Sequence, residues 1–269
     1  MGSRGDQRRR TCEVEQRLVD AGLAEAGGSH HSVTPLLLEA LELRPGERVL
    51  DVGCGGRATI AASRRVQPGG SVVGADISEA LLALARERAT GSRWATFQSA
   101  DLQVDRVDRG GFDVVMSQFG VMFFDELVVA FTNIATHVRS GGRIGFACWQ
   151  AMDRNPWFVG PAIAPLVAPA PPPAPGKSPT GPFSLGDPDR VGQILREAGF
   201  AGIRVERHAH EVDVPESAVV DDAQLTFMGV DADSLDDARK AVALRMDAFA
   251  TDNAMRRFPL AFQIVTARR

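Results

Sequence analysis

Several carboxylates and glycines of this chain follow directly on short apolar runs, where a bound molecule could reach them. Asp51 is the first, and Gly53 and Gly55 come after it in the segment VLDVGCGG. Glycine lets the chain turn sharply and admits a ligand to backbone that a Cβ would block. With Ala58, these glycines match the G-x-G-x-x-G/A spacing that seats a phosphate on a helix N-terminus. Taken alone, the segment fits both a nucleotide-type cofactor and a merely tight strand-to-helix turn.

Two further carboxylates close later apolar runs. Asp76 ends SVVGAD, where a carboxylate can accept hydrogen bonds from both hydroxyls of an adenosine ribose. The alternative role for Asp76 is a helix N-cap, but Ser78 is the more natural cap residue. Asp101 ends FQSAD beside Leu102, and its carboxylate with a neighbouring backbone N–H can receive the amino group and a ring nitrogen of adenine. Dinucleotide sites do not generally need an acid there. Asp101 therefore favours a site for another adenosine-containing cofactor over a dinucleotide site.

These polar residues meet only if strands and helices alternate along the chain. Apolar runs predict strands at RVLDVG, SVVGADI, WATFQSAD, FDVVMS and RIGFACW. Apolar residues at helical spacing predict helices over 32–43, 58–66, 79–89 and 125–138. This alternation implies right-handed βαβ units and a doubly wound parallel sheet of the α/β class, whose ligand site lies at the carboxyl ends of the strands.

The alternation stops at Trp149. Residues 161–182 are rich in proline and alanine, and we expect a loop that lies over another part of the molecule. The sequence Asp187-Pro188-Asp189 predicts a helix start, a strand is expected over 203–208, and two lid helices over 213–251. The final run, PLAFQIVTAR, predicts the last strand.

With these segments in order, residues 33–269 resemble the class I S-adenosylmethionine-dependent methyltransferases, in particular the ubiE-like group that acts on small molecules. The segments that carry the resemblance are VLDVGCGG, VVGADIS, SAD, FDVVMSQFGVMFF, RSGGRIGFACW and GPFSLGDPDRVGQILREAGF. The resemblance implies a Rossmann-like, seven-stranded sheet in the order 3-2-1-4-5-7-6 with the last strand antiparallel. It also implies S-adenosyl-L-methionine as cofactor and S-adenosyl-L-homocysteine as product.

The resemblance further implies which residues hold the cofactor. Asp51 and the loop of Gly53 and Gly55 would face its methionine part, and Asp76 its ribose. The cofactor-binding residues expected in this way are Asp51, Gly53, Gly55, Asp76, Ile77, Asp101, Leu102, Ser117 and Gln118. Arg57 departs from the small residue usual in the family; it either points to solvent or points inward and narrows the site.

We expect a single methyltransferase domain over residues 31–269, preceded by a flexible tail over 1–30. Its lid elements, helical and proline-rich, would span about 151–186 and 213–251. In-line transfer of a methyl group needs an acceptor atom held close to the methyl carbon and sheltered from water. His30 and His31 are the candidate bases. The expected acceptor wall comprises Phe119, Met122, Trp149 and Trp157, with Phe123, Phe124, Asn155 and Phe158 beside them. The acceptor is then a small, apolar or aromatic metabolite.

The composition of the chain argues against several kinds of partner and location. The net charge of −4 and the pI of about 5.8 argue against a nucleic-acid partner. The sequence contains no apolar window long enough for a membrane span and no secretory leader, and three widely spaced cysteines lack metal-ligand spacing. We therefore expect a cytoplasmic protein without membrane insertion or structural metal. The alternatives are an NAD(P)-dependent oxidoreductase that uses the same glycines, and a binding or regulatory protein that keeps the fold without turnover.

Overall fold

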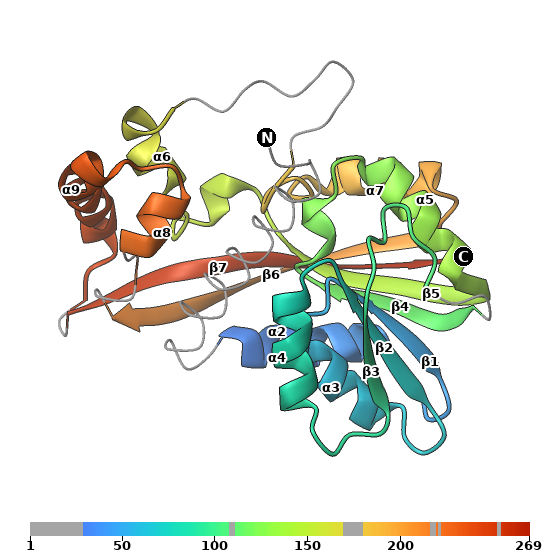
Figure 1. The fold of residues 1–269 in the computed structure, drawn as a ribbon. Coiled ribbons are helices and arrows are strands. Elements are labelled where there is room, and N and C mark those ends of the chain that lie inside the picture. The colour runs from blue at the N-terminus through green and yellow to red at the C-terminus, as the bar shows by residue number, and fades with distance from the viewer. Residues whose placement is uncertain (1–28, 108–110, 169–179, 216–218, 220–221, 252–253) are drawn as a thin grey trace.

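A seven-stranded sheet forms the centre of the molecule, with the strands in the order β3-β2-β1-β4-β5-β7-β6 (Figure 1). The computed structural model describes residues 29–107, 111–168, 180–215, 219, 222–251 and 254–269. The strands are β1 (Arg48–Val52), β2 (Ser71–Asp76), β3 (Ala95–Ser99), β4 (Phe112–Gln118), β5 (Val138–Trp149), β6 (Ala201–Pro215) and β7 (Met255–Arg268). β7 is antiparallel to both of its neighbours. The expected order and the expected antiparallel last strand are confirmed.

Helices cover both faces of the sheet, as the apolar content of its central strands requires. On one face lie α2 (Ser29–Ala40), α3 (Arg57–Arg65) and α4 (Glu79–Arg88), and on the other α5 (Leu127–His137) and α7 (Pro188–Glu197). Leu41, just after α2, packs so closely on β5 that a Cβ added at Gly145 would lie 2.6 Å from its Cδ2 atom. On the opposite face, the Phe131 ring of α5 lies 5.3 Å from that of Phe146.

The two last strands are longer than the sequence patterns indicate. β6 pairs with β7 in unbroken register from Arg204 to Pro215, although a strand was expected only over 203–208. β6 is an edge strand, so charged residues such as Glu211 and Asp213 stay exposed and interrupt its apolar pattern. The resulting antiparallel strand pair of β6 and β7 extends beyond the other strands (Figure 1).

The far end of this strand pair carries a second, smaller apolar cluster. Its helices are α6 (Gly160–Ile163), α8 (Asp222–Phe227) and α9 (Leu235–Met246). Its buried members are Val159, Ile163, Leu225, Val230, Ala238, Val242 and Met246. Two helices thus occur within the expected lid segment 213–251, but Asp213 to Pro215 belong to β6. Residues 1–28 of the expected tail and residues 169–179 of the proline-rich loop lie outside the described residues, and the domain division stays a prediction.

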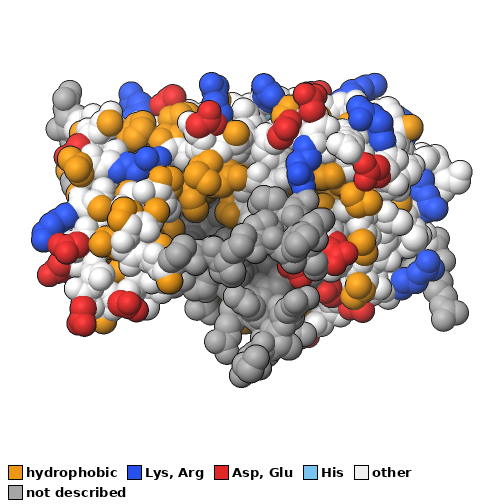
Figure 2. All heavy atoms as spheres, turned by 90° about the horizontal axis from the view of Figure 1, so that it is seen from above, with side chains coloured by type: hydrophobic (Ala, Val, Ile, Leu, Met, Phe, Trp, Pro, Cys, Tyr) orange, Lys and Arg blue, Asp and Glu red, His pale blue; other side chains and the backbone are white. Residues whose placement is uncertain are grey.

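The face of the molecule seen from above carries charges of both signs. Lys and Arg side chains alternate there with Asp and Glu, and apolar side chains lie between them (Figure 2). Among the helices of the described segments, none is long and apolar enough to cross a membrane.

Candidate functional site

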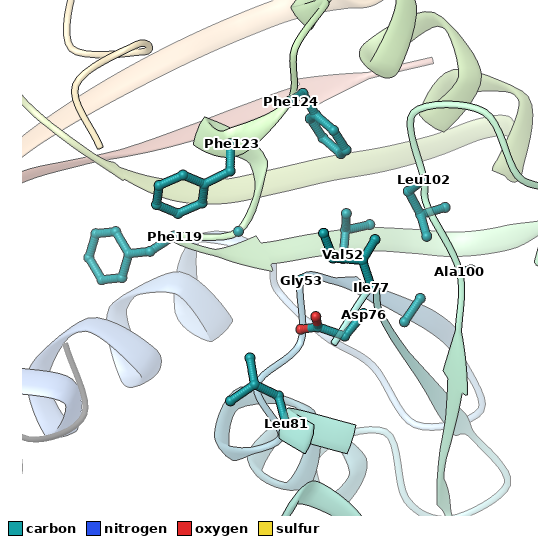
Figure 3. Close-up of a pocket in the computed structure, with 12 residues that line it drawn as sticks. Val52, Gly53, Asp76, Ile77, Leu81, Ala100, Leu102, Phe119, Phe123 and Phe124 are labelled. Atoms are coloured by element: carbon teal, nitrogen blue, oxygen red, sulfur yellow. The ribbon is translucent and has the colours of Figure 1, made fainter. Parts of the chain in front are cut away.

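A cavity lies at the carboxyl ends of β1, β2 and β4, where a doubly wound sheet binds its ligands (Figure 3). It holds about 520 Å³ of empty space, part of which is open solvent. Its lining residues are Val52, Gly53, Ala75, Asp76, Ile77, Leu81, Ala100, Leu102, Phe119, Gly120, Phe123 and Phe124. Apart from Asp76, every side chain in this set is apolar.

Two glycines set the width of the turn at the cavity floor. Gly53 has a φ of 64°, and a Cβ added to it would lie 2.7 Å from the Cα of Gly120. A Cβ added to Gly120 would in turn lie 2.8 Å from the Cα of Gly53. Since both contacts are with backbone, neither position has room for a side chain. Gly53 was expected to admit a ligand; its Cα also packs directly against the loop after β4.

Asp76 is the polar side chain of the cavity lining. Its residue is 6% exposed, and its carboxylate accepts hydrogen bonds from the backbone N–H groups of Gly55 (3.3 Å) and Ser78 (3.0 Å). Figure 3 shows this carboxylate between the Gly53 loop and Leu81. Ser78 caps α4 by accepting a hydrogen bond from the Leu81 N–H. The preference for Ser78 as the cap is confirmed, and Asp76 faces the cavity.

Asp51 lies beneath the loop and outside the cavity lining. It is completely buried, and Oδ2 accepts a hydrogen bond from the Thr59 hydroxyl at 2.6 Å. Burial raises the pKa of Asp51 to about 8; the Thr59 hydrogen bond lowers it and the nearby Asp76 charge raises it. Oδ1 has no hydrogen-bond partner among the described residues. Asp51 is therefore placed to hold α3 and the glycine loop together from below.

The other residues expected at the cofactor differ in their placement. Leu102 and Ile77 line the cavity, whereas the Asp101 carboxylate accepts a hydrogen bond from the Gln103 N–H and is not part of the lining. The Ser117 hydroxyl donates to the Val52 carbonyl at 2.7 Å and accepts from the Gly120 N–H, so it ties β1 to the loop after β4. The Gln118 side chain accepts a hydrogen bond from the Thr34 hydroxyl of α2 at 2.7 Å.

The expected acceptor wall forms a continuous set of aromatic contacts. Phe119 lines the cavity, and its ring stacks on that of Trp149 with centroids 4.2 Å apart. Trp149 contacts Trp157 at 4.9 Å, and Trp157 contacts Phe183 at 6.1 Å. Phe119 holds a φ of 62°, a left-handed conformation rare for a side chain of this size, which the ring stacking and the N–H bond to the Ala147 carbonyl accompany.

Met122 supports the aromatic contacts from within the core. It is buried, its sulfur accepts a hydrogen bond from the Trp149 N–H, and its carbonyl accepts one from the Ser184 hydroxyl at 2.7 Å. Asn155 is also buried, and it accepts hydrogen bonds from the Trp157 indole N–H and the Ala261 N–H. The position of Trp157 is thus fixed by a buried polar side chain.

His30, His31 and Arg57 are the remaining polar residues that the sequence places near the site. His30 and His31 lie in the first turn of α2, and their side chains are outside the described residues. Arg57 is exposed at the start of α3, so the interpretation that it points to solvent is confirmed.

The missed lining residues are Val52, Ala75, Leu81, Ala100 and Gly120. Only Gly120 carried a signal, as a glycine just after a strand that ends at the binding edge.

Comparisons with known proteins agree on one family. Residues 49–142 match the family model described as "Methyltransferase domain". The chain is 32% identical to nocamycin O-methyltransferase of Saccharothrix syringae, over 73% of this chain and 75% of that protein. It is 35% identical to aklanonic acid methyltransferase DauC of Streptomyces sp. (strain C5), over 41% of this chain and 51%, about half, of that relative. The crystal structure of the YcgJ protein from Bacillus subtilis superposes with a TM-score of 0.61 at 18% identity, covering 90% of this chain and 99% of that one, and shares the fold.

Proposed function

We propose, from the premise that this chain belongs to the class I S-adenosylmethionine-dependent methyltransferases and methylates a small molecule, that its acceptor is a largely apolar, aromatic metabolite. One observation carries the proposal. Phe119 belongs both to the lining of the cavity and to the aromatic contacts that include Trp149 and Trp157. A flat, apolar molecule held against those rings would lie next to the cofactor.

The residues of the cavity fit the cofactor. The glycine pair Gly53 and Gly120 keeps the floor free of side chains, and Asp76 offers a buried carboxylate for a ribose diol. Apolar residues such as Leu102 and Ala100 suit the flat faces of an adenine ring. The chemistry that the bound cofactor supplies is an electrophilic methyl group on a sulfonium.

We infer that the chain's own residues contribute orientation and exclusion of water. The aromatic rings hold the acceptor, and Phe123 and Phe124 keep the mouth of the cavity apolar. For an acceptor that must lose a proton, His30 and His31 are our candidate bases. Their helix begins near the strand ends, because Thr34, one turn further on, hydrogen-bonds to Gln118 at the end of β4.

The relatives support a role in secondary metabolism. Two bacterial methyltransferases with 32% and 35% identity are named for nocamycin and aklanonic acid. We also propose that the enzyme acts in the cytoplasm. The two described cysteines, Cys54 and Cys148, are buried free thiols, which suits a reducing compartment.

Calorimetric titration tests the cofactor site. The wild-type protein should bind S-adenosylmethionine and not NADH, and Asp76→Ala should weaken binding about tenfold or more, because charged hydrogen bonds are worth about 1.5–3 kcal/mol. The control is Asp153→Ala, which removes an exposed carboxylate outside the cavity lining and should leave the affinity unchanged. Equal affinities for wild type and Asp76→Ala would contradict the assignment of Asp76.

An acceptor screen tests the aromatic wall. Aromatic phenols and carboxylic acids should gain one methyl group by mass spectrometry when incubated with enzyme and cofactor. Trp157→Ala should raise the acceptor KM more than it lowers kcat, since the half-buried Trp157 ring is placed to bind and not to react. Methylation confined to polar aliphatic amines would contradict the proposal.

A further inference from the structure

Two histidines of β6 flank one phenylalanine of β7. His208 and His210 alternate on the strand, so their side chains project from the same face of the sheet. Their ring centroids lie 5.2 Å and 5.4 Å from that of Phe262, with interplanar angles of 15° and 19°. The two imidazoles are themselves nearly parallel, 6.5 Å apart at 5°. Their orientation is therefore fixed by stacking on a buried ring.

These histidines lie on the same face of the sheet as the buried aromatic residues beside the cavity. Trp149, Phe262 and His208 stand directly opposite one another on the adjacent strands β5, β7 and β6. Residues directly opposite in antiparallel pairs share a face of the sheet and lie within side-chain contact. Trp149 in turn stacks on Phe119 at 4.2 Å, so a row of aromatic residues on neighbouring strands, joined by the register of β5, β7 and β6, leads from the cofactor cavity to the edge strand.

The end of this row carries polar atoms without a use in the fold. The Nε2 atoms of His208 and His210 are shielded from solvent, and neither has a hydrogen-bond partner within the part of the chain that the structure describes. Buried polar atoms in folded proteins nearly always have a partner, and leaving one unsatisfied is destabilising. An imidazole nitrogen can donate to or accept from an oxygen. The oxygens of a ligand carboxyl or hydroxyl group are suitable partners for these atoms.

We propose that His208 and His210 bind an oxygen-bearing group at the end of the acceptor remote from the methylated atom. The inference rests on the proposed function, because it takes the row of rings as the acceptor wall. Several ring widths separate the histidines from Phe119, which excludes them from the reacting atoms and makes them determinants of specificity. The acceptor is accordingly an extended aromatic molecule with a carboxyl or hydroxyl group at its far end.

Two soluble naphthalenes serve as probes. 6-Hydroxy-2-naphthoic acid has a hydroxyl at one end and a carboxyl at the other, and 2-naphthol lacks the carboxyl. In calorimetric titrations of protein saturated with S-adenosylhomocysteine, we expect the acid to bind at least tenfold more tightly than 2-naphthol. His208→Leu combined with His210→Leu should reduce this preference below threefold and leave the affinity for 2-naphthol unchanged.

Two further variants separate hydrogen bonding from folding. His210→Gln combined with His208→Gln keeps an amide nitrogen near each Nε2 position and should restore part of the preference. Arg207→Gln changes the residue just before His208, on the opposite face of β6, and should leave the preference intact. In NMR spectra, the ring ¹⁵N signals of His208 and His210, assigned with single variants, should shift with the acid and not with 2-naphthol.

The possible failures are distinguishable. Equal affinity of the wild type for the two naphthalenes, or a preference that survives in the double leucine variant, would overturn the histidine site and leave the aromatic acceptor standing. Binding of S-adenosylhomocysteine with binding of neither naphthalene would contradict the aromatic acceptor and the histidine site together.

Discussion

Gly120→Ala adds one carbon atom at a point of the cavity floor where the surrounding backbone leaves no room for it. The new Cβ would lie 2.7 Å from the Val52 carbonyl oxygen, 2.8 Å from the Cα of Gly53 and 3.0 Å from the Gly53 carbonyl oxygen. All three atoms belong to backbone, which cannot rotate away as a side chain can. The ends of β1 and β4 must therefore separate by several tenths of an ångström.

The expected cost follows from what this separation disturbs. Overpacking by one carbon in a tightly packed site costs about 1–3 kcal/mol. The Ser117 hydroxyl bridges the same two segments, donating to the Val52 carbonyl at 2.7 Å and accepting from the Gly120 N–H at 3.2 Å. Weakening that bridge adds to the loss, so we expect the free energy of unfolding to fall by about 2 kcal/mol. Because Gly53 and Gly120 both line the cavity, cofactor affinity should fall about tenfold.

Urea unfolding and calorimetry measure the two effects, with Gly192→Ala as the matched control. Gly192 lies inside α7, and a Cβ there would meet first the end of the flexible Arg196 side chain, at 3.2 Å. Replacing a helical glycine by alanine should stabilise the protein by about 0.5–1 kcal/mol without changing cofactor binding. A Gly120→Ala protein as stable as wild type and equally able to bind cofactor would refute the close approach of the two loops.

Three further predictions concern titration and charge. The Asp51 carboxyl, with a pKa of about 8 in the folded protein against 3.8 ordinarily, stays protonated over a range where the unfolded chain ionises. Its contribution to stability is full below about pH 4 and is lost as pH rises to about 8. The free energy of unfolding of Asp51→Asn should therefore decline less over that range than that of the wild type. Parallel curves of unfolding free energy against pH for the two proteins would contradict this. Burial raises the pKa of Glu47, but hydrogen bonds and charge from Arg143 and Arg44 lower it on balance. This ion pair should therefore lose its stabilising effect below about pH 4.5, and Glu47→Gln should cost about 2 kcal/mol at pH 7 in urea unfolding, an effect that vanishes at low pH. Arg57→Ala should leave cofactor affinity within about twofold in calorimetry, because Arg57 is exposed; a larger change would place Arg57 in the site.

The sequence predicted the sheet well because its central strands carry strong local signals. Buried parallel strands are apolar on both faces, so β1, β2 and β4 stand out in the sequence. β6 is different, since an edge strand tolerates charge on its exposed positions and its true length depends on pairing with β7. β5 also begins earlier than the sequence pattern indicates. Its first residues include Gly141 at a φ of 76°, which reads as a turn in the sequence but lies within the strand.

The site was predictable as a location and less so as a set of contacts. Asp76 could be assigned to the cavity because Ser78 explains the helix cap without it. Asp51 carries the same kind of signal, yet it is buried under the loop, and no pattern in the sequence distinguishes a carboxylate that lines a cavity from one that supports it. The contact between Gly53 and Gly120 joins segments distant in sequence and arises only when β1 and β4 pair.

The position of β7 has a consequence for synthesis of the protein. β7 lies between β5 and β6 in the sheet but follows both in the chain, and β6 has β7 as its neighbour in the described sheet. While the ribosome is still adding residues before Met255, the first five strands can assemble, but the long β6 segment has no strand to pair with. Its unpaired N–H and C=O groups are then open to other nascent chains, as exposed strand edges generally are. The closing step of folding therefore waits for the last strand.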